Sequence, residues 1–178
     1  MRDILKLTLE LMLIAAVSAG LLAFVSVKTQ PARERAAEAK RLDAARRVLH
    51  LADGETFRED RASGAFLAER DGRVVKAAVE SVSEHGYGGP VRIMVAANAA
   101  DEIIDFAVVE ASETPGLGAK IGGDAFAAGL RGKSLEADWR VRQDGGDVDA
   151  VTSATISSRA ACEAVASAVP RLRRMLGR

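Results

Sequence analysis

The chain has 178 residues, with 25 basic and 25 acidic side chains and a formal net charge of zero. This balance provides no overall field that would attract nucleic acid or acidic substrates, so the composition argues against a nucleic-acid-binding protein. The single cysteine, Cys162, excludes an internal disulfide and a cysteine-ligated zinc or iron–sulfur site within this chain. Any redox chemistry therefore depends on a bound cofactor. We expect Cys162 to be a small buried hydrophobic residue.

An apolar segment lies near the N-terminus. Residues 11–27 contain no charged side chain, and with a helix extended back to Ile4 the segment is long enough to cross a bilayer core of about 30 Å. A cleavable signal peptide is the alternative, because small residues occur within the run. The run continues past them to Val27, however, and exceeds a usual signal-peptide core. We therefore expect residues 1–30 to form an uncleaved, single-pass transmembrane anchor.

The charges around the anchor bear on its orientation. Arg2 and Lys6 precede the apolar segment, whereas basic residues are more numerous in the stretch 28–41 that follows it. A simple positive-inside count therefore places the C-terminal domain in the cytoplasm. The rule weakens for long translocated domains.

Residues 31–52 predict a helical stalk or linker. Alanine and leucine recur there at helical spacing, at Ala36, Ala39, Leu42 and Ala45, among many charged residues. The thin apolar face either docks on a partner or packs on the chain's own domain, with the charged face toward solvent.

Residues 53–178 predict one domain that contains strands and helices. Short apolar runs between glycine-, asparagine- and aspartate-containing turns indicate strands at 65–69, 74–83, 91–97, 103–109 and 139–141. Helical patterns cover 122–130 and 157–175, and Pro170 predicts a kink in the second of these helices. The predicted fold class is α+β: an antiparallel sheet with flanking helices, preceded by one transmembrane helix.

The most informative stretch is residues 149–158, Asp-Ala-Val-Thr-Ser-Ala-Thr-Ile-Ser-Ser, which leads into the last helix. Unpaired backbone N–H groups and the helix dipole favour an anion there, so a phosphate held on Thr155 would be well placed. An ordinary N-cap, formed by Thr152, Ser153, Ser157 or Ser158, is the alternative explanation of these hydroxyl side chains.

Three segments in order carry a family resemblance. Residues 149–155 are similar to the Asp-x-x-(Ser/Thr)-Gly-Ala-Thr motif of proteins that carry FMN covalently, with Ser153 where glycine is usual. Residues 113–118 (Glu-Thr-Pro-Gly-Leu-Gly) and 86–90 (Gly-Tyr-Gly-Gly-Pro) resemble two further motifs of that family. Ala111 stands where many members have histidine. With one membrane segment and a short chain, the sequence resembles the G subunits of Rnf-type ion-translocating ferredoxin:NAD oxidoreductase complexes.

The resemblance implies a cofactor site. A flavin transferase would join the phosphate of FMN to Thr155, the last threonine of the motif. Further FMN contacts are implied for Thr152, Ser153, Ala154, Glu113, Thr114, Gly116, Leu117, Gly118 and Lys120. Glu113 either accepts backbone N–H bonds that hold its loop or contacts the polar edge of the flavin. Lys120 either neutralises the cofactor or is solvated, and Tyr87 either stacks near the ring or is a packing residue.

The resemblance also implies a function. The chain would relay electrons through covalent FMN within a redox-driven ion translocase, without catalytic residues or a metal site of its own. Its partners would be the other membrane and peripheral subunits, and its FMN domain would lie on the extracytoplasmic side of the inner (cell) membrane, opposite to the charge count. The alternatives are the equivalent subunit of a sodium-pumping NADH:quinone oxidoreductase and a membrane-tethered binding domain without flavin.

Overall fold

The computed structural model of the chain describes residues 2–113, 116 and 118–177. The chain divides into two compact units, residues 1–40 and 41–178. The first helix, α1 (Arg2–Leu49), contributes to both units, and Pro31 lies inside it without ending it.

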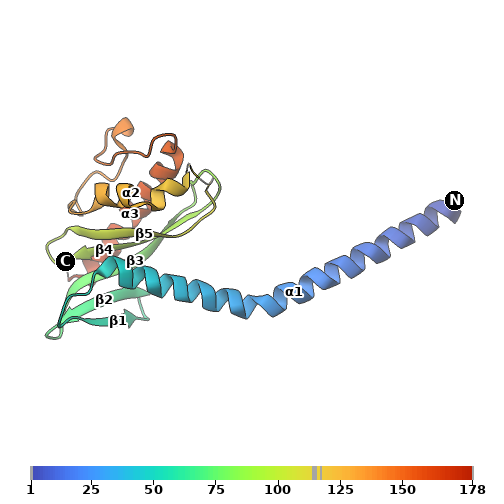
Figure 1. The fold of residues 1–178 in the computed structure, drawn as a ribbon, viewed down its shortest axis with the longest axis horizontal. Coiled ribbons are helices and arrows are strands. Elements are labelled where there is room, and N and C mark those ends of the chain that lie inside the picture. Colours follow the sequence, from blue (N-terminus) through green and yellow to red (C-terminus); the bar gives the residue numbers. More distant parts are fainter. Residues whose placement is uncertain (1, 114–115, 117, 178) are drawn as a thin grey trace. The chain divides into compact units, whose positions relative to one another are not determined.

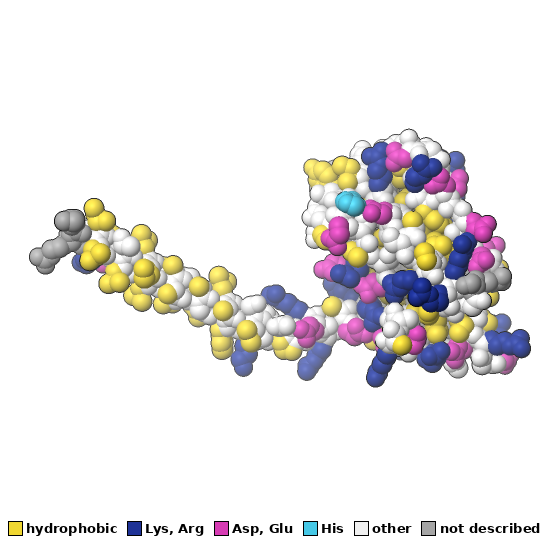
Figure 2. All heavy atoms as spheres, turned by 180° about the vertical axis from the view of Figure 1, so that it is seen from behind, with side chains coloured by type: hydrophobic (Ala, Val, Ile, Leu, Met, Phe, Trp, Pro, Cys, Tyr) yellow, Lys and Arg dark blue, Asp and Glu magenta, His cyan; other side chains and the backbone are white. Residues whose placement is uncertain are grey.

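The first unit contains the apolar part of α1, which extends to Val27, and the beginning of the charged part that follows. The apolar part is long and hydrophobic enough to cross a membrane, and its most apolar window has a mean hydropathy of 2.2 with none of its residues buried. Figure 2 shows hydrophobic side chains along the visible face of this part of the helix, followed by basic and acidic ones further along. Length and composition thus agree with the predicted anchor.

The second unit is built on a five-stranded antiparallel sheet in which each strand pairs with the next along the chain (Figure 1). The strands are β1 (Thr56–Asp60), β2 (Ala65–Arg70), β3 (Arg73–Ser83), β4 (Val91–Asn98) and β5 (Ile103–Ala111). The predicted α+β class and the four predicted strands from 65 to 109 are confirmed. Strand β1 was missed because it is a charged edge strand: Arg58 lies across from β2 and donates to Glu69 at 2.8 Å.

Helices cover both faces of the sheet. On one face, α3 (Thr155–Met175) and α2 (Asp124–Leu130) pack with a short 3₁₀ helix, η1 (Gly118–Gly122), over the larger apolar core. On the other face, the last turns of α1 bury Ala45, Val48 and Leu49 against Phe66 and Met94. The expectation that this helix packs on its own domain is thus confirmed for these turns.

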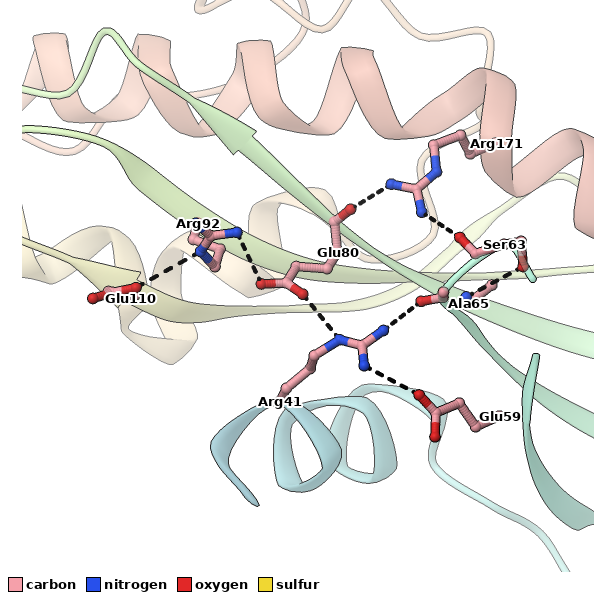
Figure 3. A network of polar contacts seen from close by, with 9 residues as sticks. Arg41, Glu59, Ser63, Ala65, Glu80, Arg92, Glu110 and Arg171 are labelled. Carbon is pink, nitrogen blue, oxygen red and sulfur yellow. Dashed lines mark hydrogen bonds and ion pairs between the residues drawn. The ribbon is translucent and has the colours of Figure 1, made fainter. Parts of the chain in front are cut away.

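Two arginines connect both helical layers to the sheet (Figure 3). Arg41 of α1 donates to the Glu80 carboxylate at 3.0 Å and to the carbonyl of Gly64 at 2.6 Å. Arg171 of α3 donates to the carbonyls of Glu80 and Ser63, at 2.7 and 3.1 Å. The turn between β1 and β2 is therefore held by guanidinium groups from both layers.

Two details differ from the prediction. The strand expected at 139–141 is absent: only Val141 makes an isolated bridge, to Val148, because hydrogen bonds between Asp138 and Asp147 fold this stretch into a tight turn. Helix α3 begins at Thr155, two residues earlier than expected, because the N–H of Ser158 already bonds to the carbonyl of residue 154.

Candidate functional site

The first turn of α3 is left without a side-chain cap. Its N-cap is Ala154, which has no side chain able to bond to the first backbone N–H groups. Ser158, one turn further along the helix, stabilises the turn instead. Its Oγ donates to the carbonyl of Ala154 at 2.9 Å and accepts the N–H of Val151 at 3.0 Å. The alternative of an ordinary serine or threonine N-cap is therefore wrong. Half-buried Thr155 is the first residue of the helix, where the dipole and N–H groups favour an anion.

Ser153 takes the backbone conformation that favours glycine. Its φ is +65°, in the left-handed region that costs an L-residue about 1–2 kcal/mol. This is the position at which the resembled motif has glycine. The turn thus keeps the conformation that glycine would allow, and the serine adds local strain beside Thr155.

Glu113, the first residue of the 113–118 motif, joins the 86–90 motif to the start of helix α3. Its side chain is buried, and its Oε1 accepts the N–H of Tyr87 at 2.9 Å while its Oε2 accepts the hydroxyl of Ser157 at 2.8 Å. The carboxylate therefore bonds to the 86–90 turn and to the first turn of α3 at once. Of the two roles considered for Glu113, the structure shows the first, acceptance of a backbone N–H, although the donor lies in a neighbouring turn.

Two motif glycines are required by this carboxylate. A Cβ added to Gly86 would lie 2.6 Å from Glu113 Oε1, and one added to Gly118 would lie 2.4 Å from Glu113 Oε2. Gly118 would also bring its Cβ to 2.7 Å from the hydroxyl of Ser157. Because such distances are shorter than van der Waals contact, a side chain at either position would displace Glu113.

A pocket of about 510 Å³ opens beside Glu113, within the size range of small-molecule sites. It is lined by Tyr87, Glu113, Gly118 and residues 153–157. The structure thus brings together five of the predicted site residues: Glu113, Gly118, Ser153, Ala154 and Thr155. It adds Ile156, Ser157, for which the sequence suggests a cap, and Tyr87, for which the sequence allows either stacking or packing.

Three of the other predicted residues, Thr152, Lys120 and Gly116, do not line this pocket. Thr152 and Lys120 line a second hollow of about 390 Å³, together with Phe126 and Asp149. Asp149, at the head of the motif, pairs with Arg142 at 2.6 Å on the surface. The turn 152–155 thus contributes to both hollows. Gly116 has a positive φ of 78° and lines neither hollow, while Thr114 and Leu117 lie outside the described residues.

The charges around α3 fix the neighbouring turn. Arg159 holds Asp144 through two hydrogen bonds of 2.6 and 2.7 Å, and these lower the pKa of Asp144.

Cys162 is buried in the core as expected, and burial raises the pKa of its thiol to about 12. Within the described ranges, no group of three His, Cys, Asp or Glu side chains could hold a metal ion.

Comparison with known proteins agrees with this geometry. Residues 86–170, which include all three motifs, match the FMN-binding domain family. The residues described above as lining the pocket, from Tyr87 to Ser157, all lie within this matched stretch.

Several relatives belong to ion-translocating complexes. The chain is 34% identical over 121 residues to the G subunit of the ion-translocating oxidoreductase complex of Shewanella loihica, covering 65% of this chain and 57% of that one. It is 38% identical over 111 residues to the corresponding G subunit of Vibrio cholerae, covering 59% of this chain and 53% of the relative. The resemblance to G subunits is therefore confirmed, and the chain spans somewhat more than half the length of these relatives.

Solved structures confirm the fold. The C subunit of the Na(+)-translocating NADH-quinone reductase of Parabacteroides distasonis superposes with a TM-score of 0.53 at 24% identity, covering 64% of this chain and 62% of that one. NqrC of Shewanella oneidensis superposes with a TM-score of 0.52 at 19% identity, covering 71% and 68%. At such identities the likeness concerns the fold alone.

Proposed function

We propose that this chain carries FMN through a phosphoester to the hydroxyl of Thr155. The observation that carries the proposal is that one buried carboxylate, Glu113, bonds both to Tyr87 of the 86–90 motif and to Ser157, two residues beyond Thr155, in the wall of the pocket that Thr155 also lines. The residues present fit the group: Thr155 is half-buried at an uncapped helix N-terminus, which suits a phosphate. Gly118 leaves its Cβ space to Glu113 and Ser157, and the pocket of about 510 Å³ that these residues line has the size of a small-molecule site.

The residues of this chain position the cofactor and do not attach it. Among the described residues, no side chain forms a hydrogen bond with the Thr155 hydroxyl that would activate it as a nucleophile. Attachment therefore needs an outside flavin transferase that brings the metal and the base. FMN, when bound, supplies transfer of one or two electrons. Glu113 and Ser157 hold the pocket wall, and Ser153 and Ala154 hold the turn that presents Thr155.

We further propose that the domain relays electrons within a membrane-bound, ion-translocating oxidoreductase complex of the Rnf type. The names of the relatives and the apolar helix near the N-terminus support this. In this proposal α1 crosses the inner (cell) membrane once, the FMN domain lies on the extracytoplasmic side, and other subunits handle ferredoxin and NAD. The fold likeness keeps a sodium-pumping NADH:quinone reductase as the second candidate, and identifying the co-purifying subunits decides between them.

The proposal is tested by in-gel flavin fluorescence of the full chain, denatured after expression with and without a flavin transferase. Thr155→Val removes the acceptor hydroxyl, and Thr56→Val, which removes an exposed hydroxyl on β1 outside the motifs, is the control. We expect fluorescence that survives denaturation in the native chain and in the Thr56 variant, and none in Thr155→Val. A native chain that stays dark despite an active transferase would instead support a binding domain without covalent flavin.

A further inference from the structure

The loop 84–90 presents one aromatic ring to the pocket. Tyr87 lies in this loop between β3 and β4, lines the pocket, and is 69% exposed. A tyrosine that packs into a core is buried, so the packing role left open by the sequence does not apply. The ring is instead free to meet a ligand in the pocket.

One end of this loop is held by α3. The Nδ1 atom of His85 lies 2.8 and 3.1 Å from the two carboxylate oxygens of Glu163, one of which also accepts the hydroxyl of Ser83 at 2.8 Å. The hydroxyl oxygen of Ser83 in turn accepts the N–H of His85 at 3.2 Å. The hydrogen bond and the charge of Glu163 raise the pKa of His85, and the charge of Glu84 adds to this, which favours the ion pair.

The other end of the loop is held by the same helix through Glu113. The N–H of Tyr87 bonds to Glu113, whose second oxygen bonds to Ser157. Both attachments thus lead to α3, two residues and eight residues beyond Thr155, at Ser157 and Glu163. Because a helix is rigid and rises by about 1.5 Å per residue, these bonds fix the backbone of Tyr87 relative to Thr155.

We propose that Tyr87 covers one face of the flavin ring, and that the contact of Ser83 and His85 with Glu163 is the device that holds it there. The inference rests on the proposed FMN site and adds the residue that shields the ring from solvent. A tyrosine suits this place because its flat, polarisable ring stacks on an aromatic ligand while its hydroxyl stays in water. His85 and Glu163 are positioning residues that act through the loop.

The test uses the full chain co-expressed with a flavin transferase. The emission of the native protein is divided by that of the denatured protein, which reports stacking per attached flavin, since a stacked tyrosine quenches flavin fluorescence. Quenching of the native emission by iodide reports access of solvent to the ring. The variants are Tyr87→Leu, Tyr87→Phe, His85→Gln and Glu163→Gln. Glu84→Gln is the matched control, because Glu84 is an exposed carboxylate in the same loop.

We expect Tyr87→Leu to raise the ratio of native to denatured emission several-fold and to increase quenching by iodide. Tyr87→Phe keeps a ring over the flavin and should remain protected from iodide. His85→Gln and Glu163→Gln should lie between these results and the native protein, and Glu84→Gln should match the native protein. Unchanged native emission and iodide access in Tyr87→Leu, with flavin attached, would overturn the role of Tyr87.

Failure of covalent attachment is a separate result. If the denatured native chain shows no flavin, the same variants are titrated with free FMN and iodide. A non-covalent site would still show brighter, more accessible flavin in Tyr87→Leu, which would support the role of Tyr87 while refuting the phosphoester. Equal behaviour of native protein and Tyr87→Leu in that titration would refute the role of Tyr87 as well.

Discussion

Asp105 and Glu113 are both buried acidic side chains of this domain, but their carboxylates accept hydrogen bonds from different kinds of donor. Asp105 receives the guanidinium of Arg131 at 2.8 Å, the imidazole of His50 at 2.7 Å and the N–H of Phe106. Glu113 receives a backbone N–H and a hydroxyl, and none of the ion pairs among the described residues includes it. The carboxylate of Asp105 is thus paired with a guanidinium inside the fold, whereas that of Glu113 is bonded to neutral donors in the wall of the pocket, and the two should respond differently to removal of their charge.

The largest effect is expected where the backbone approaches Glu113. Gly118→Ala places a Cβ against Glu113 and Ser157, so we expect a loss of about 1–3 kcal/mol in the free energy of unfolding and a loss of attached flavin. Gly129→Ala, in α2 with nothing near its Cβ, is the control and should be neutral or stabilising. Urea unfolding and in-gel fluorescence measure both. Equal stability of the two variants would show that Glu113 does not occupy this position.

Asp105→Asn should reduce the stability of the fold and leave the flavin site intact. We expect a loss of about 1–2 kcal/mol near neutral pH, because Arg131, which is itself 39% exposed, loses its buried partner. Asp124→Asn, which removes the exposed partner of the same arginine, should change little. Urea unfolding near neutral pH measures the loss, and in-gel fluorescence measures the flavin. Loss of attached flavin in Asp105→Asn would contradict the contrast between the two carboxylates.

The stabilisation from Asp105 should also depend on pH. Burial alone would raise the pKa of Asp105, but hydrogen bonds from Arg131, Phe106 and His50 lower this pKa below its ordinary value on balance. A lowered folded pKa means stability that is present above the unfolded value and lost as the pH falls through the folded one. Urea unfolding at a series of pH values from neutral into the acid range should show this loss in the native chain and not in Asp105→Asn.

Glu113→Gln should affect the flavin more than the stability of the fold, the reverse of what we expect for Asp105→Asn. The amide keeps one acceptor and the shape of the side chain, so we expect a loss of only about 0.5–1.5 kcal/mol. The turn that carries Tyr87 and the start of α3 would no longer share a carboxylate. The amount of attached flavin should therefore decrease, or the emission of the native protein should change. A variant with native flavin content, native emission and a large loss of stability would make Glu113 a structural residue like Asp105.

The smallest effect is expected at Ser153, which touches neither carboxylate. Ser153→Gly removes the strain of a left-handed backbone at φ +65°. Part of this gain is offset because glycine makes the unfolded chain more flexible, so we expect the free energy of unfolding to rise by about 0.5–1 kcal/mol. Urea unfolding measures the gain, with Ser157→Gly as a helical contrast that should destabilise. Destabilisation by Ser153→Gly would show that its side chain is needed in the turn.

The sequence predicts most of the sheet and part of the site, for physical reasons. Strands β2 to β5 follow from alternating or continuous apolar runs between turn residues. Strand β1 could not be predicted, because its stability comes from pairing with β2 and not from its own charged residues. Thr155, Glu113 and Gly118 follow from local motifs. The bond from Ser157 to Glu113 could not, because it joins residues 44 positions apart and exists only once the sheet and α3 have packed.

The most direct measurement is tandem mass spectrometry of the full chain after co-expression with a flavin transferase. Trypsin cleavage after Arg142 and Arg159 releases a peptide that contains Thr152, Ser153 and Thr155. We predict that this peptide carries the mass of FMN less one water, and that fragmentation places it on Thr155. An unmodified peptide despite an active transferase, or FMN placed on Thr152, would contradict the proposal.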